Sequence, residues 1–180
     1  MKKTTKIVVV TGAESTGKSS LCKWLAEYYN VPFVPEFART YIEQLNRAYN
    51  FSDVEKIARY QETTLRELKS QGHPLVFSDT WLIITKIWFE EVYNSKPAWI
   101  EDAITTTPID LFLVCDTDLP WIPDRVRENG GQKRLYLQNR YVEIISENKF
   151  PYYIIRGKNK TRFQNAVSAL IRAGIVKPNE

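Results

Sequence analysis

The chain has 180 residues, and its 25 Lys and Arg against 21 Asp and Glu give a net charge of +4. That length suits one domain over residues 1–180 with a substantial core. A composition of 43% hydrophobic and 26% charged residues excludes a disordered chain. So small a charge excess permits an anionic ligand without requiring nucleic acid.

No targeting or membrane segment is expected. No apolar run approaches the ~18 residues that a membrane-spanning helix needs. The basic residues 1–5 are followed by an apolar stretch that is too short for a signal peptide. Two cysteines, Cys22 and Cys115, are too few for a disulfide framework and lack metal-ligand spacing. We therefore expect a reduced, cytoplasmic protein.

Strand and helix patterns alternate along the chain. A continuous β-branched run at residues 6–11 is typical of a strand that is buried on both faces of a parallel sheet. The strand pattern recurs at residues 31–34, 75–78, 110–115 and 152–156. Apolar spacing of three and four residues predicts helices around 21–28 and at 38–49, 52–71, 80–93, 97–106, 132–148 and 161–173. Together these elements predict an α/β fold with three layers and a five-stranded parallel sheet, the fold of P-loop NTPases and nucleoside kinases.

Two features of these helices can be checked directly. Ser52 and Glu55 stand three residues apart and predict a capping box at the start of the helix at 52–71. Four tryptophans occupy helical apolar patterns and are expected in the core rather than against a ligand: Trp24, Trp81, Trp88 and Trp99.

Residues 12–19 read G-A-E-S-T-G-K-S and fit the phosphate-loop pattern G-x-x-x-x-G-K-[S/T] at every fixed position. Glycine lets the backbone curl so that successive N–H groups point at phosphate oxygens, Lys18 reaches the β- and γ-phosphates, and the Ser19 hydroxyl ligates Mg²⁺. A chance match is expected in roughly 1% of random chains of this length. The expected cofactors are ATP and Mg²⁺, and the expected nucleotide-binding residues are Gly12, Ala13, Glu14, Ser15, Thr16, Gly17, Lys18, Ser19 and Ser20.

Other classes of phosphate-loop protein carry signatures that this chain lacks. The Asn-Lys-x-Asp and Asp-x-x-Gly strings of GTPases do not occur. The predicted strand at 75–78 runs into Ser78-Asp79 rather than into the Asp-Glu pair that is usual in oligomeric AAA-type motors. Small-molecule kinases remain.

Acidic residues follow the second and third strands, at the edge where parallel sheets bind ligands. Asp79 is a candidate to hold Mg²⁺ or to accept the proton of an acceptor hydroxyl, and the alternative is a simple helix cap. Glu36 and Arg39 are candidates to bind sugar hydroxyls, although their spacing also suits a surface ion pair.

A basic loop at about residues 116–134 is interpreted as a mobile flap that neutralises the transferred phosphoryl group and excludes water. The alternative is an ordinary solvated loop. Trp121, in the same loop, is a candidate to stack on a base. The cationic residues of this segment are Arg125, Arg127, Lys133 and Arg134.

A second basic segment follows the fifth strand at residues 156–162. Backbone contacts to adenine are usual at this place in the architecture. Gly157 and Asn159 are therefore adenine-side candidates, with solvation of the chain's tail as the alternative.

Four blocks of sequence together resemble a known family. They read V-V-V-T-G-A-E-S-T-G-K-S-S-L, P-E-F-A-R-T-Y, V-F-S-D-T and C-D-T-D-L-P-W-I-P-D-R-V-R. Over about residues 6–172 the chain is similar to the nicotinamide riboside kinase domain of the bacterial NadR family. The resemblance implies ATP-dependent phosphorylation of the 5′-hydroxyl of nicotinamide riboside. It carries over the phosphate loop as the ATP site, Asp79 as the strand-end acid, Glu36 and Arg39 as substrate-side groups, and Arg127 as the flap arginine.

Two positions depart from the family pattern. Pro35 replaces an aromatic residue, usually Trp, that precedes the glutamate, and Arg125 replaces a glycine in the flap. The acceptor is therefore expected to be nicotinamide riboside or a related ribonucleoside. An H-x-G-H nucleotidyltransferase motif is absent and there is no room for a helix-turn-helix domain, so a kinase module on its own is expected.

Three hypotheses of function follow from these residues. The first is a small-molecule kinase that needs no nucleic acid, with Lys18, Asp79, Glu36, Arg125 and Arg127 as catalytic residues. The second is a regulatory NTPase that binds ATP and a metabolite. The third is a nucleic-acid end kinase that uses the basic segments. The oligomeric state does not follow from the sequence.

Overall fold

A computed structural model describes residues 4–178, so the first three residues of the basic N-terminal stretch lie outside the described part. Five strands form one parallel sheet in the order β2-β3-β1-β4-β5. This confirms the predicted α/β fold. The strands are β1 (Lys6–Thr11), β2 (Phe33–Val34), β3 (Leu75–Asp79), β4 (Leu111–Cys115) and β5 (Tyr152–Ile155).

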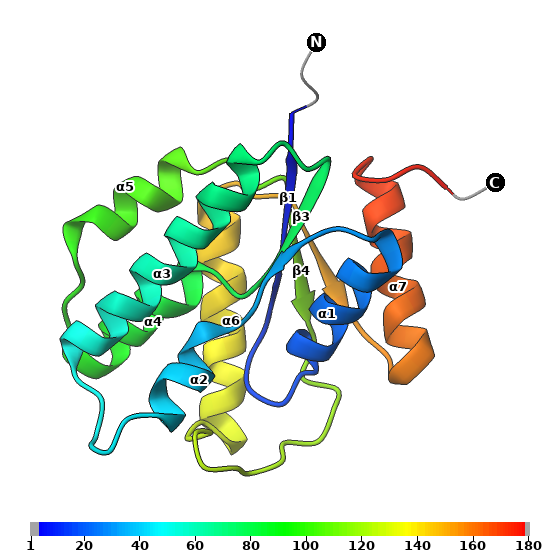
Figure 1. The fold of residues 1–180 in the computed structure, drawn as a ribbon. Helices are drawn as coiled ribbons and strands as arrows, with labels where there is room; N and C mark the ends of the chain where they lie inside the picture. The colour runs from blue at the N-terminus through cyan, green and yellow to red at the C-terminus, as the bar shows by residue number, and fades with distance from the viewer. Residues whose placement is uncertain (1–3, 179–180) are drawn as a thin grey trace.

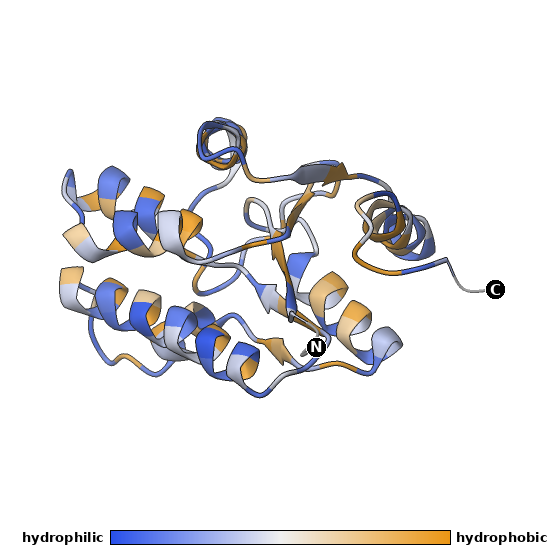
Figure 2. Ribbon diagram, turned by 90° about the horizontal axis from the view of Figure 1, so that it is seen from above, coloured by the Kyte–Doolittle hydropathy of each residue, from blue (hydrophilic) through white to orange (hydrophobic). Residues whose placement is uncertain are grey.

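Helices cover both faces of the sheet. Figure 2 shows α1 (Lys18–Tyr29) and α7 (Asn159–Arg172) on one side of it. The other side carries α3 (Phe51–Ser70), α4 (Leu82–Tyr93) and α6 (Gly131–Glu147), with α5 (Ala98–Thr106) beside α4. The short helix α2 (Phe37–Glu43) follows β2 at the carboxyl edge of the sheet, the lower edge in Figure 1. No helix within residues 4–178 is long and apolar enough to span a bilayer.

The β-branched run of β1 lies between the two layers of helices. Successive side chains of a strand point to opposite faces, so Ile7 and Val9 join the core under α3, α4 and α6, whereas Val8 and Val10 join the core under α1 and α7. All four are almost completely buried. Burial on both faces explains why this strand is continuously hydrophobic, and it places the loop after β1 in the middle of the carboxyl edge.

The connection between α2 and α3 differs from the expected one. The helix predicted at 38–49 ends at Glu43, and the chain then turns so that Arg47 Nη1 lies 2.6 Å from Asp53 Oδ2. The capping box uses Asn50 and Asp53 rather than Ser52 and Glu55: Asp53 N donates to Asn50 Oδ1 at 3.1 Å, and Asn50 N donates to Asp53 Oδ2 at 2.9 Å. The prediction was wrong because Asn50, an equally good cap, stands two residues earlier.

The tryptophan prediction is correct in part. Trp81 is fully buried, and Trp88 and Trp99 pack against the same core while remaining partly exposed. The prediction was wrong for Trp24, which is 39% exposed on the outer side of α1 and stacks on Tyr28. Its apolar spacing marks an aromatic surface cluster rather than the core.

Candidate functional site

The loop after β1 curls because two of its glycines adopt positive φ. Gly12 has φ +139°, and a Cβ there would lie 2.6 Å from the carbonyl oxygen of Cys115 at the end of β4. Gly17, with φ +75°, precedes the first turn of α1. The Thr16 hydroxyl donates to the carbonyl oxygen of Ala13 at 2.8 Å and closes the curl from inside. Residues with a side chain are strained in these conformations, which explains the fixed glycines of the motif.

Helix α6 fixes the loop from its outer side. The buried Gln138 accepts from Ala13 N at 2.8 Å and donates to the Cys115 carbonyl at 3.0 Å. Arg134, also buried, donates to the carbonyl oxygens of Glu14 at 2.8 Å and Ser15 at 3.1 Å. The sequence analysis placed Arg134 in the flap with Lys133, but the irregular segment ends at Gly130 and both lie on α6. Arg134 therefore shapes the loop, and Gln138 was not anticipated.

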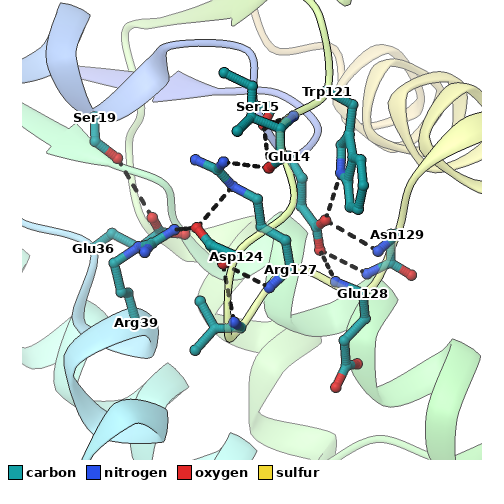
Figure 3. Close-up of polar contacts among 12 residues, drawn as sticks. Glu14, Ser15, Ser19, Glu36, Arg39, Trp121, Asp124, Arg127, Glu128 and Asn129 are labelled. Atoms are coloured by element: carbon teal, nitrogen blue, oxygen red, sulfur yellow. Dashed lines mark hydrogen bonds and ion pairs between the residues drawn. The ribbon is translucent and has the colours of Figure 1, made fainter.

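Glu36 reaches the phosphate loop from the start of α2. One carboxylate oxygen lies 3.9 Å from Lys18 Nζ, and the other accepts a hydrogen bond from the Ser19 hydroxyl at 3.4 Å (Figure 3). Glu36 is the N-cap residue of α2, yet its side chain makes no capping hydrogen bond. The carboxylate thus faces the loop instead of its own helix, as expected for a strand-end ligand group.

Asp79 lies behind this pair, at the end of β3, and is 2% exposed. Burial, the largest cause, and the neighbouring Glu36 charge together raise the pKa of its carboxyl to about 7, against the opposing effects of Lys18 and Ser19. One of its oxygens, Oδ1, is buried without a hydrogen-bond partner. The helix-cap alternative is wrong, because Trp81 is the N-cap residue of α4 and no side chain caps that helix.

The backbone around Asp79 is held in an uncommon conformation. Thr80 has φ +66°, which a β-branched residue rarely adopts outside functional sites. Gln61 of α3, itself buried, donates to the carbonyl oxygens of Asp79 and Thr80 at 3.0 Å each and to Ser78 Oγ at 3.1 Å. Gln61 was not anticipated as a site residue. The sequence does mark it, because it is a polar residue in the apolar stripe of a helix, between the buried Ile57 and Leu65.

A cleft of about 470 Å³ opens in front of these groups. Its polar floor is the phosphate loop with Glu36 and Arg39, and part of the flap lines it from the opposite side. Its apolar wall comes from α4, α6 and the connection before α3, and consists of Tyr49, Ile84, Ile87, Trp88, Val92, Leu137 and Tyr141. The Tyr49 and Trp88 rings meet edge to face with centroids 5.0 Å apart. Such a cleft fits a ligand with a phosphate end and an aromatic end.

The flap brings Arg125 and Arg127 to the cleft, as predicted, but Trp121 does not line it. The indole of Trp121 packs on Gly130, where a Cβ would lie 3.2 Å from the ring. Arg39 does not pair with Glu36. Its guanidinium binds Asp124 of the flap at 2.8 Å, and this contact lowers the pKa of Asp124 to about 2 (Figure 3).

The two arginines of the second basic segment pair with acids of the flap's first residues. Arg156 lies 2.7 Å from Asp116, and the buried Arg162 pairs with Asp118. Gly157 N donates to Asp118 as well, at 2.6 Å. Gly157 lies just before α7 and Asn159 is the first residue of that helix. Neither is among the residues that line the cleft, and their adenine-side role stays a prediction.

A family model described as "AAA domain" matches residues 7–162. The chain belongs to this family. β3 ends in Ser78-Asp79 and not in an Asp-Glu pair. The lack of that pair therefore does not exclude a chain from this family.

Two curated relatives carry the name trifunctional NAD biosynthesis/regulator protein NadR. The one from Salmonella typhimurium (strain LT2) is 25% identical over 156 residues, and the one from Escherichia coli (strain K12) is 25% identical over 154 residues. The alignments cover 84% and 82% of the chain, and the chain spans 38% and 37% of the relatives. The resemblance to NadR is therefore confirmed for a part of those proteins.

Solved structures agree with this relationship. A NadR protein in complex with NAD and AMP-PNP has a TM-score of 0.76 and 25% identity, and covers 98% of this chain and 51% of its own. A NadR protein in complex with NR gives the same TM-score at 24% identity, over 98% and 53% of the two chains. A deoxyadenosine kinase from M. mycoides shares the fold, with a TM-score of 0.65 and 14% identity over 92% and 99% of the two chains.

The raised pKa of Asp79 predicts a pH-dependent stability. A carboxyl whose pKa rises from 3.8 to about 7 on folding stabilises the protein fully only at low pH, and the contribution is lost as the pH rises through 7. Asp79→Asn resembles the protonated carboxyl at every pH. The difference in free energy of unfolding between Asp79→Asn and the unsubstituted chain, measured without nucleotide and with EDTA, should therefore change with pH. It should shift in favour of Asp79→Asn by about 2–3 kcal/mol from pH 5 to pH 8.

Urea unfolding followed by circular dichroism measures this difference. Asp102→Asn on the exposed side of α5 is the matched control and should show no such trend. A stability difference for Asp79→Asn that is constant from pH 5 to pH 8 would contradict the assignment.

Proposed function

We propose that the chain is an ATP-dependent kinase that phosphorylates the 5′-hydroxyl of nicotinamide riboside or a related ribonucleoside. One observation carries the proposal: two carboxylates, Glu36 and Asp79, converge on the phosphate-binding Lys18 and Ser19 beside a cleft with an aromatic wall. The NadR relationship supports a phosphotransferase, and its complexes with NR and with AMP-PNP support these two ligand classes.

The residues suggest a division of labour. Lys18 neutralises the β- and γ-phosphates, and Arg125 and Arg127 neutralise the charge that develops on the transferred group. Glu36 lines the cleft and Asp79 does not, which favours Glu36 as the acceptor of the hydroxyl proton.

Asp79 is then the candidate ligand of Mg²⁺. Its unpartnered Oδ1 and the nearby Ser19 hydroxyl are the oxygen ligands that Mg²⁺ prefers, and a bound ion would neutralise phosphate charge. Within residues 4–178, no group of three or more His, Cys, Asp and Glu side chains is placed to hold a metal. Most of the remaining ligands would therefore be phosphate oxygens and water, the usual arrangement for Mg²⁺ in kinases.

A coupled ADP-release assay over a panel of ribosides tests the proposal. We expect riboside-dependent turnover, and we expect Lys18→Ala to abolish it while circular dichroism shows the same fold. ATP hydrolysis without any acceptor would favour the regulatory NTPase instead. Phosphorylation of oligonucleotides with a steep salt dependence would favour the end kinase, which the pairing of Arg156 and Arg162 with acids does not support.

The aromatic wall predicts a second effect. A base that stacks on Trp88 gains roughly 1–3 kcal/mol, so Trp88→Ala should raise the KM for the acceptor about tenfold and leave the KM for ATP within about twofold. Steady-state kinetics with each substrate varied in turn measure both values. Trp99→Ala is the control, because Trp99 packs under Arg59, outside the residues that line the cleft. Equal changes in both KM values would place the acceptor base elsewhere.

A further inference from the structure

Glu14 stands at a variable position of the phosphate-loop motif, and its side chain is bound to the flap. Its carboxylate accepts hydrogen bonds from Trp121 Nε1 at 3.2 Å, Glu128 N at 3.3 Å, Asn129 N at 3.0 Å and Asn129 Nδ2 at 2.9 Å. Figure 3 shows the Glu14 side chain reaching away from its own loop into this group of donors. The motif itself places no requirement on this position.

The neighbouring Ser15 makes a second attachment to the flap. Its hydroxyl accepts from Ile122 N at 3.0 Å and donates to the Ile122 carbonyl at 3.3 Å. The flap is thus fixed to the phosphate loop at Ile122 and again at Glu128 and Asn129. The segment 123–127 lies between these two attachments and includes Arg125 and Arg127, the flap arginines that line the cleft.

The turn between the attachments has its own support. Asp124 accepts from the backbone N–H groups of Val126 and Arg127 at 3.0 Å each. Arg127 also donates to the Ile122 carbonyl at 2.6 Å. The turn of segment 123–127 is closed internally, and the position of the segment depends on the contacts at its two ends and on the ion pair of Asp124 with Arg39.

A carboxylate in a phosphate loop carries an electrostatic penalty. It lines the same cleft as Lys18 and would repel the charge of a bound triphosphate. Four donors aimed at the carboxylate offset its charge, because hydrogen bonds to an ionised group are stronger than those between neutral groups. An open flap would leave Glu14 unpaired at the phosphate site, so the same residue that holds the flap also disfavours nucleotide binding when the flap is open.

We propose that Glu14 is a positioning residue that locks the flap onto the phosphate loop, so that Arg125 and Arg127 face the transferred phosphoryl group only in the closed state. The catalytic part of this statement rests on the proposed kinase function. The lock itself is a property of the nucleotide-free protein and is measured without turnover.

Hydrogen–deuterium exchange of the nucleotide-free protein tests the lock. In Glu14→Gln the backbone N–H groups of Glu128 and Asn129 lose a charged acceptor, and peptides over 121–130 should exchange at least tenfold faster. Glu27→Gln, on the exposed side of α1, is the matched control and should exchange as the unsubstituted chain does. Unchanged exchange in Glu14→Gln would overturn the proposal.

Kinetics test the positioning role. Glu14→Gln should lower kcat at least tenfold while the affinity for AMP-PNP stays within about threefold, because the lost charge repels nucleotide less. Faster exchange with an unchanged kcat would show that the lock does not position the arginines and would overturn that role. If the unsubstituted chain turns over no riboside, the proposed kinase function is wrong. Hydrogen–deuterium exchange and the affinity for AMP-PNP still test whether Glu14 holds the flap.

Asn129→Ala provides a second route if Glu14→Gln unfolds. It removes the Nδ2 donor from the flap side and leaves the phosphate loop intact. Asn129→Ala should accelerate exchange over the same peptides. In the double variant with Glu14→Gln it should accelerate exchange by less than it does alone, because both substitutions remove the same interaction. Full additivity of the two substitutions would contradict a shared contact.

Discussion

The close approach of the phosphate loop to the end of β4 is the constraint on which the rest of the site depends. Gly12 leaves no room for a Cβ beside the Cys115 carbonyl, and Gln138 bridges that same carbonyl to the N–H of Ala13. β1 and β4 are neighbours in the sheet, so this contact fixes the loop relative to both strands. Contacts within the chain therefore hold the loop in its curled shape, which reduces the reorganisation that phosphate binding needs.

The charges of the site are balanced by ion pairs within the chain. Lys18 is opposed by Glu36, Arg39 by Asp124, and Lys133 by Glu91. A nucleotide and its acceptor must therefore exchange with these acids rather than bind to bare cations. The raised pKa of Asp79 belongs to the same balance, since two carboxylates near one lysine are not both favoured as anions.

The same pairing of charges shows which cations behind the net charge of +4 are matched by acids. The arginines after β5 are matched by Asp116 and Asp118, so that end of the molecule offers little free cationic surface from its arginines. Arg125 and Arg127 of the flap line the cleft. These arginines of the two basic segments are therefore placed either beside the cleft or against acids of the chain.

Sequence reasoning succeeds where one local pattern determines the outcome. The run of β1 requires two-sided burial, and the motif of 12–19 requires the loop, so the parallel sheet and the phosphate site both follow. It fails where a partner distant in sequence decides. Arg134 looks like a flap cation, but α6 turns it onto the Glu14 and Ser15 carbonyls. Trp24 looks like a core residue, but it stays 39% exposed although it contacts Phe163 of α7. Gln61 lies between these cases, because its polarity within an apolar stripe was visible while its partners at the end of β3 were not.

The flap is the element that joins the two sides of the cleft. Glu14 holds it to the phosphate loop, and Arg39 holds Asp124 from α2, the helix whose first turn carries Glu36 to Lys18 (Figure 3). A movement of α2 on binding an acceptor would act on the flap through Arg39, and a movement of the phosphate loop on binding ATP would act on it through Glu14. Both ligands therefore bias the same segment, and by linkage each would favour the binding of the other. On the proposed kinase function such coupling would suit a transferase, because it would favour the closed flap when donor and acceptor are both bound.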